Sequence, residues 1–261
     1  MADSQNTDAI TAGLGTKVVG RNVWHYPIVA STMEAARELA RQSAPEGTVV
    51  IADQQTAGRG RLGRTWLSPE GSLALSVLLY PDFSELPSLI MLASLAVADA
   101  IRNVTGLGSQ IKWPNDVLVN GRKVCGILIE NRIGRVRQGE VNYAVIGIGV
   151  NVNVPAAALA EVRPPPTSLS TELGRPVSIQ ELTRDLLKQM DRRYLELKSG
   201  GSLFETWRDR LVTVGRPVRV TSGEASLEGI AESVERDGSL SVRTNDGRLT
   251  RVFAGDVTLK E

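Results

Sequence analysis

The segment that most constrains the fold is a loop rich in arginine and glycine, which joins two apolar, β-prone runs. Arg59, Arg61 and Arg64 alternate with glycines between a run at residues 48–52 and another at residues 73–80. Glycine lets the backbone approach a ligand closely, and arginine supplies a planar, permanently charged fork for carboxylates and phosphates. The sequence therefore predicts two strands joined by a flexible cationic loop that could close over a small anion.

This loop matches neither of the common nucleotide-binding fingerprints. It lacks the Lys-Ser/Thr ending of the Walker A motif. Gly58, Gly60 and Gly63 have the spacing of the dinucleotide motif, but an arginine-rich turn would crowd the start of a helix.

The composition is that of a soluble globular protein. Its single cysteine and single histidine limit the metal sites and nucleophilic sites that the chain could form. Of 261 residues, 42% are hydrophobic and 23% are charged, and a formal net charge of +1 argues against broad electrostatic binding to nucleic acid. Cys125 is the only cysteine, which excludes an intrachain disulfide. His25 is the only histidine, so we expect no zinc site and assign His25 a structural role.

The sequence carries no evident membrane or export signal. No apolar run approaches the roughly 20 residues of a membrane helix, and the polar residues 1–15 lack the apolar region of a signal peptide. We therefore expect a cytoplasmic protein that does not bind a membrane, with a flexible N-terminal tail over residues 1–20.

Hydrophobic periodicity and turn residues divide the rest of the chain into a mixed set of helices and strands. Ser31 and Glu34 have the capping-box spacing that starts a helix. Asn120-Gly121 is a strong hairpin signal, and the prolines at 164–166 mark a loop. The patterns predict helices at residues 86–104, 179–198 and 203–211, strands at 23–29, 124–130 and 143–150, and an exposed hairpin turn at 131–138.

The character of the chain changes after Val214. Short β-prone runs at residues 218–220, 227–230, 240–242 and 249–253 are separated by Gly and Asp-Gly turns. This pattern predicts a small β-barrel. We expect a tail at 1–20, a main α/β (α+β) domain at 21–213 and the barrel at 214–261.

The polar residues favour chemistry that depends on positive charge rather than on a protein nucleophile. Cations and amides gather in several loops, but no nucleophile–base pair stands out. Attack of one anion on another needs many cations and no nucleophile. Activation of a carboxylate by ATP is such a reaction, because the carboxylate itself attacks the α-phosphorus.

Four strings carry a resemblance to a known family. STMEAA, QQTAGRGRLGRTW, KWPNDVLVNGRKVCGILIE and GIGVNVN resemble biotin–protein ligases, in that order and with similar intervals. The resemblance runs from about residue 23 to 173. It implies an SH2-like catalytic domain, with a mixed β-sheet flanked by helices, followed by a small C-terminal SH3-like β-barrel.

The resemblance also implies a two-step reaction. Biotin and MgATP give biotinyl-5′-AMP and pyrophosphate, and a lysine of a biotin carboxyl carrier domain then attacks the adenylate and releases AMP. The implied ligands are biotin, ATP and Mg²⁺, the implied partner is the carrier protein, and the enzyme is a monomer or a homodimer. Only about 20 residues precede Val23, so we expect the monofunctional type, without the DNA-binding domain or repressor activity of bifunctional members.

The family's site residues map onto particular positions of this sequence. For biotin, the resemblance implies contacts from Ser31, Thr32, Gln55, Gly58, Arg59, Gly60, Arg61, Lys123, Gly147, Gly149 and Val150. For ATP, it implies Arg59, Arg64, Trp66, Lys112, Asn115 and Asn151, with Mg²⁺ near Asn115. Lys123 and Arg59 would stabilise charge, and Asp116 would orient or deprotonate the incoming amine. Met33 stands where some members have Asn, so the resemblance does not imply a polar contact with biotin at this position.

Three other interpretations stay open at this point. A lipoate–protein ligase has a related fold and parallel chemistry, and competition between biotin and lipoate would separate the two. A nucleic-acid-binding module could use the arginines of the loop against phosphates, and steep salt dependence would reveal it. An inactive relative would bind biotin without activating it.

Overall fold

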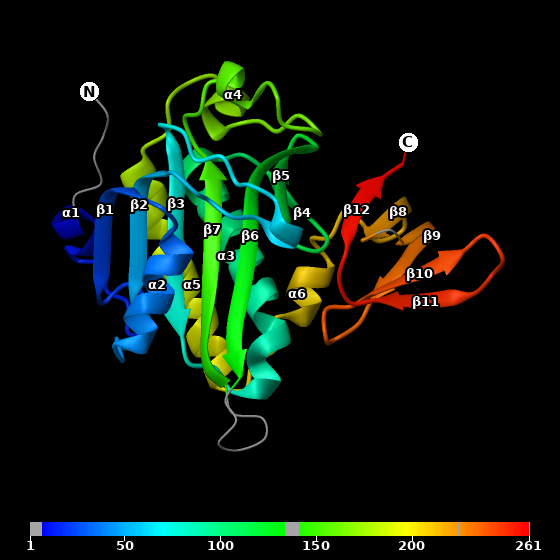
Figure 1. Cartoon of the computed structure of the whole chain (residues 1–261), viewed down its shortest axis with the longest axis horizontal. Coiled ribbons are helices and arrows are strands. Elements are labelled where there is room, and N and C mark those ends of the chain that lie inside the picture. Colours follow the sequence, from blue (N-terminus) through cyan, green and yellow to red (C-terminus); the bar gives the residue numbers. More distant parts are fainter. Residues whose placement is uncertain (1–6, 134–140, 224, 261) are drawn as a thin grey trace.

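The larger part of the chain is built on a mixed seven-stranded sheet (Figure 1). The computed structural model describes residues 7–133, 141–223 and 225–260. The strand order is β1-β2-β3-β7-β6-β5-β4, in which β1 and β2 are parallel and every other neighbouring pair is antiparallel. The strands are β1 Val23–Val29, β2 Val49–Gln55, β3 Ser72–Leu79, β4 Ser109–Lys112, β5 Asp116–Val119, β6 Arg122–Ile133 and β7 Val141–Asn151.

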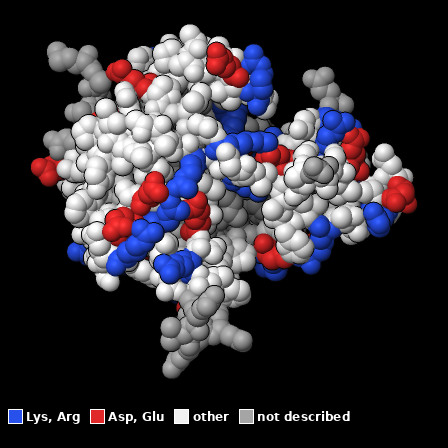
Figure 2. All heavy atoms as spheres, in the orientation of Figure 1, with Lys and Arg blue, Asp and Glu red and all other residues white. Residues whose placement is uncertain are grey.

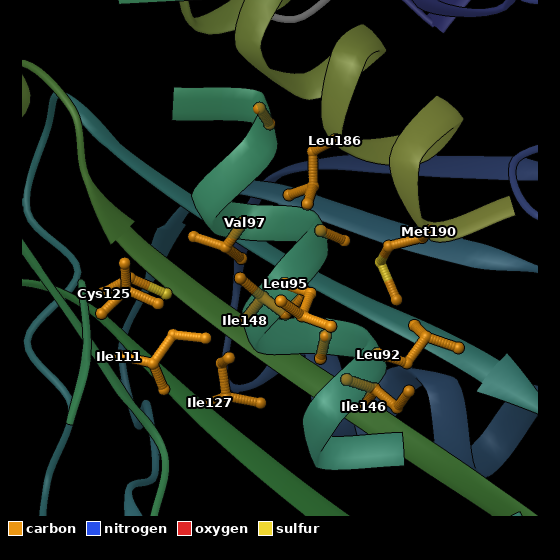
Figure 3. Close-up of a cluster of buried hydrophobic side chains, with 14 of the residues drawn as sticks. Leu92, Leu95, Val97, Ile111, Cys125, Ile127, Ile146, Ile148, Leu186 and Met190 are labelled. Carbon is orange, nitrogen blue, oxygen red and sulfur yellow. The ribbon is translucent and has the colours of Figure 1, made fainter. Parts of the chain in front are cut away.

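Two long helices cover one face of this sheet. Helix α3 (Leu86–Thr105) lies against the sheet and packs on α5 (Ile179–Lys198). Leu92 and Leu95 of α3 face Ile146 and Ile148 of β7 in a cluster of buried hydrophobic side chains (Figure 3). Alternation along β7 sends residues 146, 148 and 150 to this side, which makes it the main hydrophobic core.

Helix α3 corrects one expectation from the sequence. It is long and apolar enough to cross a membrane by length and composition alone, although we expected no such run. Most of its residues are buried, because the sheet and α5 enclose it. The helix is therefore part of the protein core.

The opposite face of the sheet is covered only in part. Helix α2 (Thr32–Arg41) packs there on Val50, Leu78 and Val145 in a smaller apolar cluster. Residues 147 and 149 of β7 belong to the same face, and both are glycines. The face beyond α2 consequently lacks the side chains that would fill it.

The N-terminal segment is packed from residue 7 on, where a flexible tail at 1–20 was expected; residues 1–6 of that tail lie outside the described residues. Helix α1 (Thr7–Thr11) buries Ile10, and Val19 is also buried. The carboxylate of Asp191 on α5 accepts three backbone N–H groups, from residues 17, 18 and 19, at 2.8–2.9 Å. Because these contacts lie more than 170 positions apart in the chain, a local pattern does not reveal them.

Replacement of Asp191 should destabilise the fold measurably. In Asp191→Ala the three N–H donors lose their acceptor, and unsatisfied buried donors cost about 1–3 kcal/mol in the free energy of unfolding. Urea unfolding of the wild type and the variant should show a lower midpoint with an unchanged slope. A matched loss is not expected in Asp185→Ala on the same helix, and equal midpoints for Asp191→Ala and the wild type would refute the anchoring role.

The C-terminal part is a five-stranded antiparallel sheet in the order β11-β10-β9-β8-β12. The strands are β8 Pro217–Ser222, β9 Ala225–Val234, β10 Leu240–Thr244, β11 Leu249–Val252 and β12 Asp256–Leu259. Four of them fall on the predicted runs. The sequence patterns missed β12, which has only four residues.

The two parts share one hydrophobic cluster. Val218 and Val242 of the barrel belong to the same buried cluster as the residues around α3. Trp113, which is 1% exposed, joins the two parts further. Its backbone N–H donates to Oγ1 of Thr213 at 2.9 Å, and its indole N–H donates to the carbonyl of Gly238 in the barrel at 2.8 Å.

Most predicted elements agree with the structure. Helix α5 has the predicted bounds, α3 ends one residue later than predicted, and α6 (Phe204–Arg208) is shorter than predicted. The turn predicted at 131–138 begins inside β6, and its residues 134–138 lie outside the described residues. Helix α4 (Leu169–Leu173) and the short 3-10 turns at Arg61–Gly63, Phe83–Glu85 and Ala156–Leu159 were not predicted.

Candidate active site

A cavity of about 700 Å³ lies over the uncovered part of the sheet, between the arginine/glycine segment and the barrel. Figure 2 shows basic side chains along this face that lead into the cleft between the two parts. The predicted residues that line the cavity are Ser31, Thr32, Gln55, Arg59, Gly60, Arg61, Arg64, Trp66, Lys112, Asn115, Asp116, Lys123, Gly147, Gly149 and Asn151. Segments far apart in the sequence therefore meet here.

Two predicted residues do not line the cavity. Val150 points into the main core, because side chains alternate along β7 and its neighbour Gly149 takes the cavity side. Gly58 is buried beneath the arginine/glycine segment, where a Cβ would collide with the carbonyl group of Trp66. Gly58 thus shapes the segment.

The floor of the cavity is made by glycines on which two larger side chains rest. A Cβ on Gly149 would lie 2.5 Å from Nε1 and 2.6 Å from Cζ2 of Trp66. A Cβ on Gly147 would lie 2.9 Å from Cγ of Met33. The absence of side chains on β7 therefore lets the indole and the thioether lie directly on the sheet. Met33 consequently forms an apolar wall.

One end of the cavity is neutral and polar. Thr32 donates from its backbone N–H to Oε1 of Gln55 at 2.9 Å, and Ser76 donates to the Thr32 hydroxyl at 2.9 Å. Ser31 stands at the N-cap of α2, but its side chain makes no capping bond. Its hydroxyl is buried and has no partner among the described residues. Ser31 lines the cavity, and the donor and acceptor capacity of its hydroxyl is unused among the described residues.

The arginine/glycine segment folds into a short hairpin over the cavity. Backbone bonds join Trp66 N–H to the Gly58 carbonyl at 2.9 Å and Gly60 N–H to the Arg64 carbonyl at 2.7 Å. Leu62 and Gly63 turn the tip with positive φ values of 54° and 73°. We call residues 55–68 the Arg/Gly hairpin, since bridges at its two ends pair residue 55 with 68 and residue 59 with 65.

The other end of the cavity is strongly cationic. Lys123 makes an ion pair with Asp116, with Nζ and Oδ1 2.6 Å apart, and its Nζ lies 5.6 Å from the centre of the Trp66 ring. Burial lowers the pKa of Lys112, while nearby Asp116 opposes that shift. Burial also lowers the pKa of Arg61. These partly buried cations favour an anionic ligand, which would restore the charge balance.

The hairpin is tied to this cationic end. Arg61 donates to Oδ1 of Asn115 at 3.0 Å, and Asn115 donates in turn to the carbonyl of Ile127 at 2.8 Å. Asn115 follows a cis peptide bond between Trp113 and Pro114, in the turn between β4 and β5. The KWPND string is thus the corner that presents Lys112, Asn115 and Asp116 to the cavity.

Two further segments line the cavity and were missed in the sequence. A proline-rich loop contributes residues 163–166, and the whole of β12 contributes residues 256–259. Asn151 holds this loop, because its amide donates to the carbonyl of Thr167 at 3.0 Å. The three consecutive prolines indicated a loop, but nothing in the sequence indicated that this loop lines the cavity. No local signal marks the short strand β12.

His25 lies outside this arrangement. Its Nε2 is 2.9 Å from Oδ1 of Asp53, and neither residue lines the cavity. Among the described residues there is no cluster of three or more His, Cys, Asp or Glu side chains that could hold a metal ion. Cys125 is buried, which raises the pKa of its thiol. The cavity is thus suited to charge stabilisation rather than to thiolate or zinc chemistry.

Both parts of this chain match known protein families. Residues 24–151 match the biotin/lipoate A/B protein ligase family, and residues 213–260 match the biotin protein ligase C-terminal domain. A biotin–[acetyl-CoA-carboxylase] ligase of Paracoccus denitrificans is 36% identical over 76% of this chain and 85% of its own length. The bifunctional ligase/repressor BirA of Bacillus subtilis is 35% identical over 96% of this chain and 78% of its own length. The chain belongs to the biotin protein ligase family.

Solved biotin protein ligases have the same fold. The enzyme from Aquifex aeolicus in complex with biotin and ATP superimposes with a TM-score of 0.76 at 29% identity, covering 92% of this chain and 99% of that one. A biotin protein ligase from Leishmania major in complex with biotinyl-5-AMP gives a TM-score of 0.62 at 26% identity, covering 90% of this chain and 99% of that one. The predicted family and the predicted fold class, including the small C-terminal barrel, are confirmed.

Proposed function

We propose that the cavity binds biotin and ATP side by side, makes biotinyl-5′-AMP and transfers the biotinyl group to a lysine of a biotin carboxyl carrier domain. The observation that carries this proposal is the union of a neutral polar end and a cationic end in one cavity. Relatives named as biotin–[acetyl-CoA-carboxylase] ligases support it. So does the Aquifex enzyme, which was solved with biotin and ATP.

The neutral end suits the ureido ring of biotin. A ureido group carries two N–H donors and one carbonyl acceptor, and the Ser31 hydroxyl and the Thr32–Gln55 pair offer partners of both kinds. The indole of Trp66 and the thioether of Met33 lie on the glycines of β7, so the ureido ring would rest against these side chains rather than against the sheet. Met33 adds an apolar contact. We assign biotin to this end, with its carboxylate directed toward Lys123.

The cationic end suits the adenylation step. A carboxylate oxygen of biotin bonds to the α-phosphorus, the bond from that phosphorus to the bridging oxygen breaks, and pyrophosphate leaves. Both reactants are anions, so nearby cations lower the barrier by offsetting their repulsion and the charge of the transition state. We assign this role to Lys123 and Arg59, and we assign the phosphates to Lys112 and Arg64. Trp66 and Asn151 would border the nucleoside.

The transfer step needs a neutral amine. The ε-amine of the carrier lysine attacks the carbonyl carbon of the mixed anhydride, AMP leaves, and the amine loses a proton. Asp116 is the carboxylate that lines the cavity beside Lys123. We assign it to orient the incoming amine and accept that proton.

Magnesium fits this site as a companion of ATP. Mg²⁺ usually keeps several waters and is bound by one or two protein oxygens together with substrate phosphates. The oxygens of Asn115, Asp116 and Asp256 line the cationic end, and Asn115 is the one that we assign as its nearest protein ligand. When bound, the ion would neutralise charge on the phosphates.

We propose a catalytic domain at 21–213 and a barrel at 214–261. We also propose that the enzyme is cytoplasmic. We propose that the enzyme is a monomer or a homodimer.

Pyrophosphate exchange tests the function directly. The wild type should incorporate labelled pyrophosphate into ATP only when biotin and Mg²⁺ are present, because reversal of adenylation needs the biotinyl adenylate. Lipoate should neither replace biotin nor compete with it. Exchange that depends on lipoate would establish the lipoate alternative, and the absence of exchange with both acids would rule out an acyl-adenylating enzyme.

Replacement of Arg61 should release the activated intermediate. Arg61 ties the hairpin to Asn115 and to the barrel, so Arg61→Gly should open one side of the cavity and let biotinyl-5′-AMP escape. Streptavidin blotting should then show biotin on lysines of a bystander such as serum albumin. Arg41→Ala, which alters an exposed arginine of α2 outside this cavity, should leave the bystander unlabelled. An unlabelled bystander with an active Arg61→Gly enzyme would count against the closing role.

A further inference from the structure

The barrel touches the Arg/Gly hairpin at a point where β12 begins. The guanidinium of Arg64 makes an ion pair with the carboxylate of Asp256. Arg61 also donates to the carbonyl of Gly255 at 3.3 Å. Two consecutive barrel residues therefore hold two arginines of the hairpin.

Asp256 is held on a rigid element. Its strand pairs with β8, where Asp256 lies opposite Thr221. Gly255 before it has a φ of 152°, and a Cβ there would lie 2.9 Å from Cγ1 of Val220. This position favours glycine. The backbone at Gly255 therefore fixes the position of Asp256 relative to the Arg/Gly hairpin.

The carboxylate of Asp256 lies among the cations that would bind a substrate phosphate. Asp256 lines the cavity together with Arg61, Arg64 and Lys112. The other carboxylate of this cationic group, Asp116, is already paired with Lys123. Carboxylate and phosphate oxygens bind the same guanidinium donors, so Asp256 and a phosphate of ATP compete for Arg64.

We propose that Asp256 holds the Arg/Gly hairpin on the barrel by taking the place of a substrate phosphate at Arg64, and that the phosphates of ATP displace it. This inference rests on the proposed function, because it assigns ATP to the cationic end. The ion pair is suited to such an exchange. Arg64 is 66% exposed, and exposed ion pairs contribute little to stability, so an incoming polyphosphate replaces the contact easily.

Limited proteolysis with trypsin tests the hold without any substrate. Trypsin cleaves after arginine, and the hairpin carries three of them. Asp256→Asn should be cleaved in the hairpin about two- to fivefold faster than the wild type, the factor expected when one exposed ion pair is lost. The KM for ATP in pyrophosphate exchange should fall by about the same factor, because ATP no longer competes with a carboxylate.

Two further variants separate the carboxylate of Asp256 from general effects on the barrel. Asp256→Glu keeps the charge and should restore slow cleavage. Glu228→Gln removes a carboxylate of the same barrel that pairs with Arg219 and Lys260, and it should leave hairpin cleavage unchanged. Equal hairpin cleavage in Asp256→Asn and the wild type would overturn the proposal. A raised KM for ATP would also overturn it, since Asp256 would then assist ATP.

The proteolysis arm is independent of the ligase activity. Suppose that Asp256→Asn is cleaved faster but the wild type shows no biotin-dependent exchange. This result would support the contact between hairpin and barrel, and it would refute the proposal that ATP competes with Asp256 for Arg64. Normal exchange in the wild type together with unchanged cleavage would refute the hold alone.

Discussion

Lys123→Ala should lower kcat for the biotin-dependent exchange of pyrophosphate into ATP by about a hundred- to a thousand-fold. In the structure the ammonium group of Lys123 lies between Asp116 and the face of Trp66, inside the cavity. It is the cation that we place between the biotin carboxylate and the α-phosphorus. Its loss removes the charge that stabilises the transition state, while the other contacts to both substrates remain.

A second variant distinguishes a lost cation from an unpaired carboxylate. Lys123→Ala leaves Asp116 without its partner, and a free carboxylate repels both substrates. The double variant Lys123→Ala with Asp116→Asn removes that repulsion, and we expect it to stay inactive in exchange. Recovery of exchange in the double variant would show that Lys123 acts only by neutralising Asp116. Lys198→Ala, which removes a lysine paired with Glu85 away from the cavity, should exchange at the wild-type rate.

Gly149→Ala should lower kcat/KM for biotin by about a hundredfold while the protein stays folded. The added methyl group would lie 2.5–2.6 Å from Nε1 and Cζ2 of Trp66, and a rigid indole cannot avoid it by changing one torsion at its tip. The ring must lift from the sheet into the cavity. Lys123, which faces the ring, would then move from its position near the reacting carboxylate.

Gly108→Ala provides the matched control. A Cβ at Gly108 meets nothing within 4 Å, and the residue has no positive φ. Exchange assays should give wild-type kcat/KM for this variant, and thermal melting should show that Gly149→Ala remains folded. If Gly149→Ala kept full activity, the position of the Trp66 indole on the sheet could not matter for the reaction.

Local signals predicted most of the regular elements. Helix α5 has the predicted bounds because its capping serine, Ser178, and its apolar spacing agree. Strand β12 and the packed N-terminal segment were missed, since both depend on partners far away in the chain. The acceptor of residues 17–19 is Asp191, and no pattern within those residues reveals it. Tertiary contacts therefore account for the main differences in the fold.

The candidate site was predictable to the extent that its motifs are contiguous. The Arg/Gly hairpin and the KWPND corner were found as strings, and the structure brings them together at one cavity. The sequence alone could not tell that Ser31 leaves its hydroxyl free although it stands at a helix N-cap. Nor could it tell that Val150 faces the core, because that depends on which side of β7 is covered. Asp256 has no local signal at all.

The indole of Trp113 has a consequence for how the protein unfolds. It hydrogen-bonds to the barrel from the strand end that presents Lys112 and Asn115, and the buried apolar cluster is continuous across the two parts. Loss of the barrel would thus expose core surface of the larger part. Heating should therefore give a single calorimetric transition, with equal calorimetric and van't Hoff enthalpies. If a barrel from a relative replaced this one in evolution, it would have to offer a backbone carbonyl in the same place for the indole of Trp113.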